Sequence, residues 1–342
     1  MTNWKKIKEN PKLKENLLLK AQVLGAIREF FQYEGFTEMD TPTMVVSPDP
    51  SPFNEVLETK TVGGEKLFFT PSPEFFLKKL LVVGLKNIYQ ITKAYRDRQE
   101  KDPLHLREFT ILEWYRNNAT YTDLMADCEK LIGFVWERLS QRIQKSKSEI
   151  NLNYQGQEIN LAPPWKRISC QEAFKQYAHI NLDEFLEEKK ARKICQKKGY
   201  QMTQENTWEE LYHQVFLNEI EPELQKFPTL ILYDYPAPLA ALSQIKESDP
   251  HYAERFEFYL GGLEMGNGYS ELTDWQDQEK RLQSNVATRK AGRMKVFDYD
   301  HDLIQALKEG LPKTAGIAVG VDRLVMLFTD STDIHEVTPL SI

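Results

Sequence analysis

The stretch from Phe256 to Leu272, FEFYLGGLEMGNGYSEL, constrains the fold more than any other part of the sequence. Its aromatic residues and closely spaced glycines favour strands over a helix. We therefore predict two neighbouring strands joined by a tight connection, and we place the turn at the GNG segment, residues 266–268.

Three glutamates in this stretch, Glu257, Glu264 and Glu271, follow one another at intervals of seven residues. If neighbouring strands bring the carboxylates together, the cluster suits a magnesium ion that carries a nucleotide, or an ammonium group. The alternative is three solvated glutamates on the outer face of a sheet. Other segments must decide between these interpretations.

The overall composition excludes several classes of protein. With 342 residues, of which 41% are hydrophobic and 28% charged, the chain is typical of a globular protein with one large core or two smaller ones. There is no apolar run of about 18 residues and no signal-like N-terminus, so we expect a cytoplasmic protein without membrane association. The three cysteines form no zinc motif. A net charge of -7 argues against broad binding to a phosphate backbone.

Two helical regions and an edge strand are predicted from periodicity. Residues 12–34 repeat apolar side chains at steps of three and four, as in an amphipathic helix that ends at Gly35. The next segment, FTEMDTPTM, predicts a strand that breaks at Pro42 and cannot lie inside a sheet. Residues 120–230 read as a helical insertion.

For the whole chain, we predict a single α+β domain over residues 1–342, with a mainly antiparallel sheet flanked by helices.

The segment LFFTPSPEFFLKKLLVVG predicts a strand over residues 67–70 that leads into a helix. Ser72 is the expected N-cap, with Pro73 at the first helical position. Glu74 then lies at the start of the helix. There it either complements the helix dipole or faces the ammonium group of a ligand.

From Ile88 to Tyr115 the sequence predicts a strand, a charged loop and a second strand. Glu113 and Tyr115 lie two residues apart, so both point to the same face of the second strand and suit a lysine-like ammonium group. The loop suits a triphosphate, although surface hairpins are also often charged. Its cationic side chains are Arg96, Arg98, Lys101, His105 and Arg107.

The segment AGIAVGVDRLVML, residues 315–327, combines small residues with the start of an apolar helix. Gly316 and Gly320 permit close approach of the backbone. Arg323, near the start of the helix, is placed to meet phosphates from a second side. Because the chain has neither a P-loop nor a Rossmann fingerprint, an ATP site would have to use arginines and carboxylates on an antiparallel sheet.

Together these residues resemble the class II aminoacyl-tRNA synthetases, and among them the lysyl-tRNA synthetases and their short paralogues, the elongation factor P lysine ligases. TPTM at 41–44 is similar to the first class motif, YRD…HLREFTILEWY to the second and GIAVGVDRLVML to the third. SPE at 72–74 and EMGNGYSEL at 264–272 extend the likeness over almost the whole chain. The resemblance implies an ATP- and Mg²⁺-dependent ligase that forms an aminoacyl-adenylate, and a homodimer formed through residues 12–45.

The resemblance also implies roles for the matching positions. Arg96 and Arg323 are the implied catalytic residues, which hold the ATP phosphates, and Glu257 and Glu264 are the implied magnesium ligands. The implied ATP-binding residues are Arg96, Asp97, Arg98, Gln99, His105, Leu106, Phe109, Glu264, Met265, Gly320 and Arg323. The implied amino-acid-binding residues are Ser72, Pro73, Glu74, Glu113, Tyr115, Asn267, Glu271 and Ala318.

The resemblance also implies which residues bind each end of a lysine substrate. Glu74 would meet the α-amino group, and Asn267 would lie near the carboxylate. Glu113, Tyr115 and Glu271 would receive the side-chain ammonium group.

Two features bear on the acceptor. Because only a short segment precedes the first predicted helix, we expect no anticodon-binding domain and no anticodon-dependent binding of tRNA. Ala318 stands where synthetases of this type usually have glycine, and the short paralogues resemble this chain in having alanine. One methyl group can change which amino acid fits a pocket. The resemblance is thus compatible with (R)-β-lysine as substrate and a lysine side chain of elongation factor P as acceptor.

The loop after Arg96 departs from the family pattern, in which Arg-x-Glu sets a glutamate against the adenine amino group. Gln99 can accept that hydrogen bond, and Glu100 can if the loop shifts, whereas Arg98 cannot. The altered loop motivates one alternative, a catalytically inactive paralogue with a regulatory role. A second alternative keeps the fold in a lysine-activating or tRNA-charging enzyme.

Overall fold

The part of the chain that the computed structural model describes comprises residues 3–52, 54–97, 102–142 and 150–341. Arg98 and Gln99, which were predicted to contact ATP, lie outside these residues, as do Glu100 and Lys101. Within the described ranges, no helix has the length and apolar character needed to cross a membrane.

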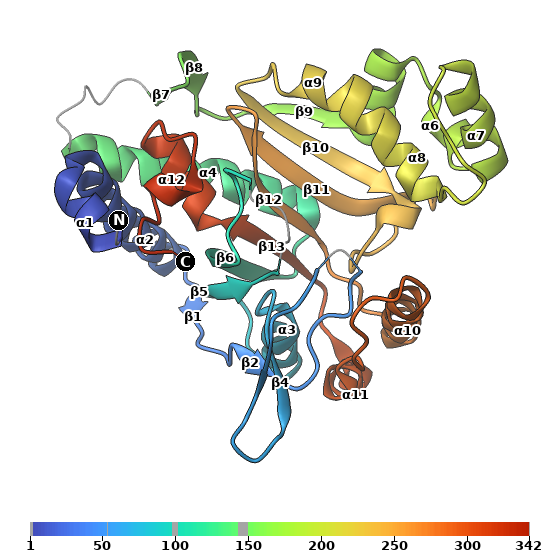
Figure 1. Ribbon diagram of the computed structural model, residues 1–342, viewed down its shortest axis with the longest axis horizontal. Helices are drawn as coiled ribbons and strands as arrows, with labels where there is room; N and C mark the ends of the chain where they lie inside the picture. Colours follow the sequence, from blue (N-terminus) through green and yellow to red (C-terminus); the bar gives the residue numbers. More distant parts are fainter. Residues whose placement is uncertain (1–2, 53, 98–101, 143–149, 342) are drawn as a thin grey trace.

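A central eight-stranded sheet confirms the predicted α+β class (Figure 1). The pairs between its six middle strands are antiparallel, while each edge strand is parallel to its neighbour. The edge strand β1 is the one predicted to break before Pro42. In order across the sheet the strands are β1 (Thr37–Glu38), β5 (Ile88–Tyr95), β6 (Glu108–Asn117), β13 (Thr314–Gly320), β12 (Leu263–Ser270), β11 (Tyr252–Leu260), β10 (Thr229–Pro236) and β9 (Lys166–Ser169).

One face of this sheet packs against helices α2, α4 and α12 around the main hydrophobic core. Helix α2 is the amphipathic helix predicted from the sequence, and it buries Ile27 and Phe31 beside Trp114 of β6. The short helix α1 precedes it, and a single 3₁₀ turn, η4, follows α12. These elements span Asn3–Glu9 (α1), Pro11–Tyr33 (α2), Tyr121–Arg142 (α4), Val321–Phe328 (α12) and Ile334–Glu336 (η4).

A second group of helices, α3, α10 and α11, lies together on another side of the sheet (Figure 1). A separate hydrophobic cluster joins these helices to Ile88 of β5 and Tyr115 of β6. A three-stranded sheet in the order β2, β4, β3 lies near α3, and β4 matches the predicted strand at residues 67–70. The bounds are Glu74–Val82 (α3), Trp275–Ala291 (α10), His301–Gly310 (α11), Met44–Val45 (β2), Glu58–Lys60 (β3) and Lys66–Phe69 (β4).

Residues 120–230 are helical over much of their length but also contain strands that were not predicted. The hairpin β7–β8 forms a sheet of its own, and β9 joins the edge of the main sheet. The helices after β9 enclose a second core against β9 and β10, at the upper right of Figure 1. Four-residue strands carry too little alternation to be read from sequence.

The remaining elements of this part are Asn151–Tyr154 (β7), Gln157–Asn160 (β8), Cys170–Ala173 (α5), Phe174–Ala178 (η1), Leu182–Phe185 (α6), Glu188–Lys197 (α7), Trp208–Val215 (α8), Phe216–Ile220 (η2), Glu221–Leu224 (α9) and, after β10, Ala237–Leu239 (η3).

The turn between β11 and β12 is formed by Gly261 and Gly262, so the prediction of a turn at residues 266–268 is wrong. Both turn glycines have positive φ, at 57° and 78°, which L-residues with side chains rarely adopt. The GNG segment instead lies inside β12. A Cβ atom on Gly268 would come within 2.8 Å of a core side chain, Ile317. Close packing between strand and core, rather than a turn, therefore requires glycine there.

A β-bulge at Met265 sets the orientation of the glutamates on these strands. Met265 is buried in the main core. Glu264 pairs with Tyr259, so these two side chains share the face opposite Met265. Glu257 lies two residues before Tyr259 on the same strand and therefore points to that face as well. In a regular strand, the seven-residue interval between Glu264 and Glu271 would turn them to opposite faces. The extra residue brings both to one face.

Candidate functional site

Strand β6 separates core residues from site residues by simple alternation. Leu112 and Trp114 are fully buried in the main core, whereas Glu113 and Tyr115 point to the opposite face. There the Tyr115 hydroxyl donates to Glu113 Oε2 over 3.3 Å. The sequence predicted this pairing of a carboxylate with a phenol, and the structure brings the two together.

The start of helix α3 delivers a second set of polar groups to Glu113. The helix begins one residue later than expected, with Pro73 rather than Ser72 as its N-cap. The Ser72 hydroxyl accepts from the Glu74 N–H over 3.0 Å and donates to Glu113 Oε1 over 2.5 Å. A hydroxyl can do both, so Ser72 positions the Glu113 carboxylate while it orders the first turn of the helix.

Lys78, one turn further along α3, was not predicted to belong to the site. Its side chain is 1% exposed, and its Nζ lies 2.6 Å from Glu74 Oε1 and 2.7 Å from Glu271 Oε2. Both Glu74 oxygens also accept from the Tyr269 hydroxyl at 3.1 Å. The four-residue spacing of Glu74 and Lys78 was visible in the sequence as a helical pair. The contact with Glu271 was not, because it joins distant parts of the chain.

These residues form one buried cluster, which we call the amine pocket. Burial, and then the charge of Glu74, raise the pKa of Glu113 to about 8. Burial also raises the pKa of Glu271 to about 8, although Lys78 opposes this. Glu271 Oε2 is engaged by Lys78, whereas Oε1 accepts no hydrogen bond within the described residues, so this oxygen is available to a cationic ligand. The amine pocket comprises Ser72, Glu74, Lys78, Glu113, Tyr115, Tyr269 and Glu271.

Strand β13 lies between β6 and β12, which carry the two sides of the amine pocket, and so forms its floor. Ala318 pairs with Glu113 on one side and with Asn267 on the other, and directly paired residues share a face of the sheet. Gly316 pairs with Tyr115 in the same way. A Cβ atom on Gly316 would collide with the Tyr115 ring and with Glu271 Oε1. Glycine at 316 therefore keeps the bottom of the pocket open.

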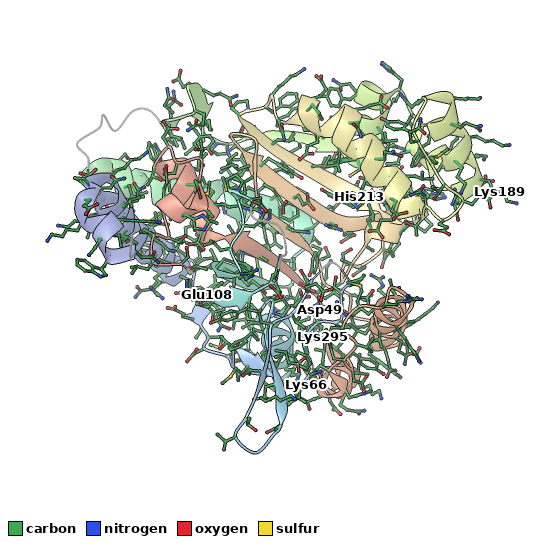
Figure 2. The ribbon with its side chains drawn as sticks, viewed as in Figure 1. Asp49, Lys66, Glu108, Lys189, His213 and Lys295 are labelled. Atoms are coloured by element: carbon green, nitrogen blue, oxygen red, sulfur yellow. The ribbon has the colours of Figure 1, made fainter. Side chains whose placement is uncertain are left out.

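Asp49 is another acidic group near the pocket that the sequence did not identify. It lies on the loop between β2 and β3 (Figure 2), and its Oδ1 accepts from the Ser51 N–H over 3.1 Å. Burial, and then the nearby Glu74 charge, raise the pKa of Asp49 to about 6, while Arg96 opposes this. The buried Arg289 holds the loop by donating to the Ser51 carbonyl over 2.9 Å.

Arg323 and His105 meet at the other end of the site. Arg323 donates from Nη1 to the Glu264 carbonyl over 2.8 Å and from Nε to the Leu104 carbonyl over 3.3 Å. Its Nη2 lies 2.5 Å from His105 Nε2, and His105 Nδ1 lies 2.7 Å from Asp102. Because the guanidinium can only donate, His105 accepts at Nε2 and donates at Nδ1.

Arg96 links the two ends of the site. Its guanidinium lies 5.2 Å from the centroid of the Phe109 ring. Burial raises the pKa of both Glu113 and Glu264, and the charge of Arg96 opposes part of that rise. Beside it, Asp97 pairs with Arg107 at 3.0 Å. Cationic groups thus reach the site from the two ends of the loop between β5 and β6 and from α12. We call Arg96, His105, Phe109, Glu264 and Arg323 the phosphate site, after the role that the sequence predicts for them.

Two residues predicted to contact ATP have their side chains in the main core. Leu106 is 8% exposed and Met265 is 1% exposed, so only their backbone groups are available to a nucleotide. Gly320, in contrast, is the N-cap of α12 and directly precedes the helix that carries Arg323.

Arg255 was not predicted, yet it organises Asn267 and Glu257. It donates from Nη2 to Glu257 Oε1 over 2.9 Å and from Nε to Asn267 Oδ1 over 3.3 Å. Tyr259 donates to the other Glu257 oxygen over 2.5 Å. The alternation of Arg255, Glu257 and Tyr259 along β11 was the signal in the sequence that they share a face.

Glu257 and Glu264 suit the magnesium ion predicted for them. Burial, and then the charge of Glu257, raise the pKa of Glu264, although 46% of the Glu264 side chain is exposed. No group of three or more His, Cys, Asp or Glu side chains in the described part of the chain is arranged to hold a metal ion. Magnesium commonly takes one or two carboxylates and completes its shell with phosphate and water oxygens, so this donor pair fits.

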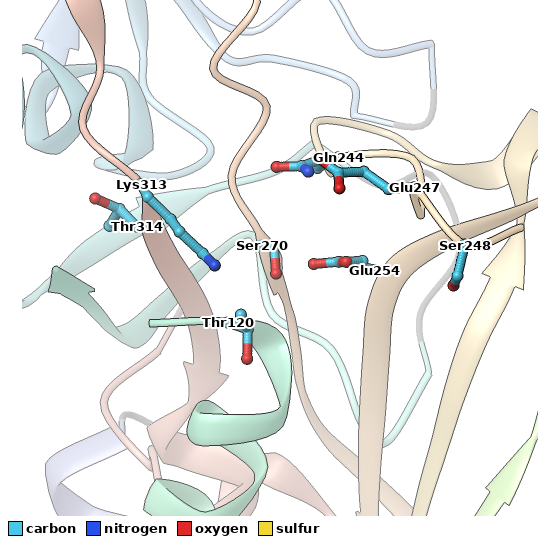
Figure 3. A pocket seen from close by; sticks show the side chains of 8 residues that line it. All are labelled: Thr120, Gln244, Glu247, Ser248, Glu254, Ser270, Lys313 and Thr314. Atoms are coloured by element: carbon cyan, nitrogen blue, oxygen red, sulfur yellow. The ribbon is translucent and has the colours of Figure 1, made fainter. Parts of the chain in front are cut away.

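A separate pocket of about 240 Å³ lies near the ends of β12 and β13 (Figure 3). Ser270 lines it and directly precedes Glu271, but successive residues of a strand point to opposite faces. Its lining contains no residue of the amine pocket or the phosphate site. The residues are Thr120, Gln244, Glu247, Ser248, Glu254, Ser270, Lys313 and Thr314.

Comparison with known proteins identifies the family of this chain. The chain is 34% identical over 330 residues to a protein of Pelotomaculum thermopropionicum named lysine–tRNA ligase, covering 96% of this chain and 63% of that protein. Proteins with the same name from Magnetococcus marinus and Moorella thermoacetica are each 32% identical, over 96% of this chain and 64% and 65% of theirs. The chain thus spans less than two thirds of the length of these relatives. The model for tRNA synthetases class II (D, K and N) matches residues 2–341, and the chain therefore belongs to this family.

Proposed function

We propose that the protein is an ATP-dependent ligase that activates lysine or (R)-β-lysine as an aminoacyl-adenylate. The observation that carries the proposal is the buried Glu271 carboxylate, which lies in the same pocket as Glu113 and Tyr115. Its Oε2 pairs with Lys78 at 2.7 Å, whereas its Oε1 has no hydrogen bond within the described residues. Lys78 already contacts Glu74 as well as Glu271, so it compensates the buried acidic groups only in part, and an unsatisfied buried oxygen is costly. The ammonium group of a lysine-like substrate supplies a partner for the remaining oxygen.

In the proposed reaction, one oxygen of the substrate carboxylate attacks the α-phosphorus of ATP, and the bond to the β-phosphate breaks to release pyrophosphate. The amine pocket fixes the substrate by its ammonium groups, with Glu74 toward one amino group and Glu113, Tyr115 and Glu271 toward the other. Asn267 lies toward the carboxylate. Positioning of this kind turns the attack into an effectively intramolecular step.

Charge neutralisation is the second catalytic contribution in this proposal. Arg96 and Arg323 hold the phosphates from two sides, with His105 beside Arg323 and Phe109 as the stacking surface for adenine. These fixed cationic groups stabilise the charge that develops on the phosphate oxygens. Magnesium, held by Glu257 and Glu264, would supply further neutralisation of the triphosphate.

As acceptor we propose a lysine side chain of elongation factor P. Its uncharged ε-amino group attacks the carbonyl carbon of the adenylate, forms an amide and releases AMP, while the amine proton passes to solvent or to AMP. The net charge of -7 favours a protein acceptor over a polyphosphate backbone. The Ala318 methyl group on the pocket floor is compatible with an amino group shifted from the α- to the β-carbon.

A tRNA acceptor is the second candidate, because the relatives are named lysine–tRNA ligases. The deciding experiment begins with pyrophosphate exchange in the presence of ATP and magnesium, with (S)-lysine, (R)-β-lysine or no amino acid. The preferred amino acid is then offered with purified elongation factor P or lysine tRNA. Labelled elongation factor P supports the first acceptor, and labelled tRNA supports the second. Absence of exchange with either amino acid contradicts the proposed activity.

We further propose a homodimer formed through residues 12–45. Three apolar side chains of this region are more than half exposed: Leu18 at 57%, Tyr33 at 71% and Met44 at 52%. Exposed apolar side chains of this size are available to a contact between two copies of the chain. Sedimentation at micromolar concentration should give the mass of two chains, and a single monomeric species would contradict the proposal.

Replacement of Gly316 by alanine should close the bottom of the amine pocket. The added methyl group has to displace the Tyr115 ring and Glu271, so we expect the KM for the amino acid to rise about tenfold or more, with a smaller change for ATP. Gly268→Ala is the matched control, because its methyl group meets Ile317 on the core side of the sheet. It should lower the melting temperature without a selective effect on the amino acid. Equal KM effects in both variants would contradict the assignment.

Without ligand, we expect the free energy of unfolding to fall as the pH rises from about 5 to about 8. The pKa values of Glu113 and Glu271 are about 8, above the ordinary 4.5. The folded protein therefore binds more protons than the unfolded protein in this window, and stability decreases as pH increases. Saturating lysine should reduce the slope, because ammonium groups replace the protons.

Denaturant unfolding across this pH range tests the expectation, with Glu113→Gln as the comparison because glutamine cannot ionise. The variant should show a flatter dependence than the original protein. The same slope in both would mean that Glu113 does not titrate in this window.

A further inference from the structure

Lys78 is a buried cation held between two carboxylates that come from different elements. Its side chain is 1% exposed, and its Nζ lies 2.6 Å from Glu74 on the same helix and 2.7 Å from Glu271 at the end of β12. The Tyr269 ring lies beneath the ammonium group, 5.8 Å away at its centroid. A charge so deeply buried is retained only where its partners compensate it.

This position makes Lys78 a bridge across the amine pocket. The two oxygens that it contacts can be no farther apart than the sum of its two ion-pair distances. Glu74 and Glu271 would repel one another at such a separation without a cation between them. Lys78 therefore fixes the relative positions of two carboxylates that are assigned to opposite ends of the substrate.

Lys78 has a second role in the charge balance of the amine pocket. Lys78 pairs with two carboxylates, Glu74 and Glu271, and the amine pocket holds a third, Glu113, which Ser72 and Tyr115 contact. At the border, Asp49 and Arg96 oppose each other in charge. Two negative charges are then left for the ligand, which matches the two ammonium groups of a diamino acid.

We propose that Lys78 determines the specificity of the amine pocket by setting the number of negative charges left for the ligand. It acts as a permanent counter-ion, so the pocket selects substrates with two ammonium groups. The proposal rests on the function proposed above. Lys78 acts through Glu74 and Glu271 and is a positioning residue. With Lys78 removed, a diamino acid leaves one buried carboxylate uncompensated, and a small cation from solution can take the vacant place.

Substitution of Lys78 by methionine tests this, because methionine keeps much of the volume and removes the charge. We expect the KM for lysine in pyrophosphate exchange to rise at least tenfold, while the KM for ATP changes less than threefold. Lys78→Arg, which keeps the charge, should recover part of the loss. Methylammonium should lower the raised KM of Lys78→Met about fivefold or more, and tetramethylammonium, which has no N–H group to donate, should not.

The neighbouring residue provides a matched control. Lys79 also lies on α3, and its Nζ pairs with Asp300 and Asp302 at 2.8 Å each, outside the amine pocket. Lys79→Met should therefore lose two ion pairs without a selective change in the KM for lysine and without a response to methylammonium. An equal effect of the Lys78 and Lys79 substitutions on the lysine KM would overturn the proposal.

A second measurement separates this proposal from the proposed activity. Methylammonium should raise the melting temperature of Lys78→Met, but not that of Lys79→Met, whether or not either protein catalyses exchange. Tighter binding of lysine by Lys78→Met, or no response of that variant to methylammonium in either assay, would refute the counter-ion role. Absence of exchange in the original protein, together with stabilisation of Lys78→Met by methylammonium, would reject the activity and retain the cation site.

Discussion

Replacement of Arg323 by alanine should lower the rate of pyrophosphate exchange by about 100- to 1,000-fold, equivalent to about 2.7–4 kcal/mol of transition-state stabilisation. Arg323 is held by the carbonyl groups of Glu264 and Leu104 and by His105, so its guanidinium is fixed before ATP arrives. A preorganised cation stabilises developing charge without reorganisation during the reaction. Lysine at this position should recover only part of the rate, because it cannot maintain these three contacts.

Arg281→Ala is the control for this substitution. Arg281 also donates to two backbone carbonyl groups, Ala241 at 2.8 Å and Ser243 at 2.9 Å, and pairs with Asp277 at 2.7 Å, but it belongs to neither the amine pocket nor the phosphate site. It should change stability and leave the exchange rate within a few-fold. Comparable losses of rate in the two variants would mean that Arg323 contributes to folding rather than to phosphate binding.

Replacement of Glu271 by glutamine should raise the KM for lysine by about 100-fold, which corresponds to about 2.7 kcal/mol. Glutamine keeps the shape of the side chain but removes the charge that faces both Lys78 and the substrate ammonium group. The KM for ATP should change less than threefold, because Glu271 lies at the amine end of the site. Steady-state pyrophosphate exchange with each substrate varied in turn gives both constants.

Glu129→Gln is the matched control for a buried carboxylate. Glu129 is 6% exposed and accepts from the Trp165 N–H over 2.9 Å, on the side of the sheet that carries α4. The substitution should lower the melting temperature and leave the ratio of the two KM values unchanged. If Glu271→Gln raises the two KM values equally, the assignment of Glu271 to the ammonium group is wrong.

Local patterns in the sequence were sufficient to predict several elements that position the site. The three- and four-residue periodicity predicted α2, and the strand–loop–strand pattern predicted β5 and β6. Alternation in β6 also predicted that Glu113 and Tyr115 share a face. These predictions succeeded because each depends on neighbours within a few residues, where backbone geometry alone fixes the direction of the side chains.

The arrangement of β11 and β12 shows where local patterns were insufficient. The GNG segment has the composition of a turn, but the turn is formed by Gly261 and Gly262. The bulge at Met265, which brings Glu264 and Glu271 to one face, has no local signature. The register of β12 depends on how this strand packs between β11 and β13, and it is fixed by which side chains become buried across the whole sheet.

The sequence by itself determined the α+β class from local patterns, and the family from the resemblance of its motifs. It also predicted most of the polar residues that the structure brings together, because these predictions depend on residue types, motifs and short-range spacing. Only the tertiary structure decided that Lys78 lies between Glu74 and Glu271 and that Ser72 holds Glu113. The contacts of Lys78 with Glu271 and of Ser72 with Glu113 join residues that are distant in the chain, and they form because buried charges and hydroxyl groups require partners once water is excluded.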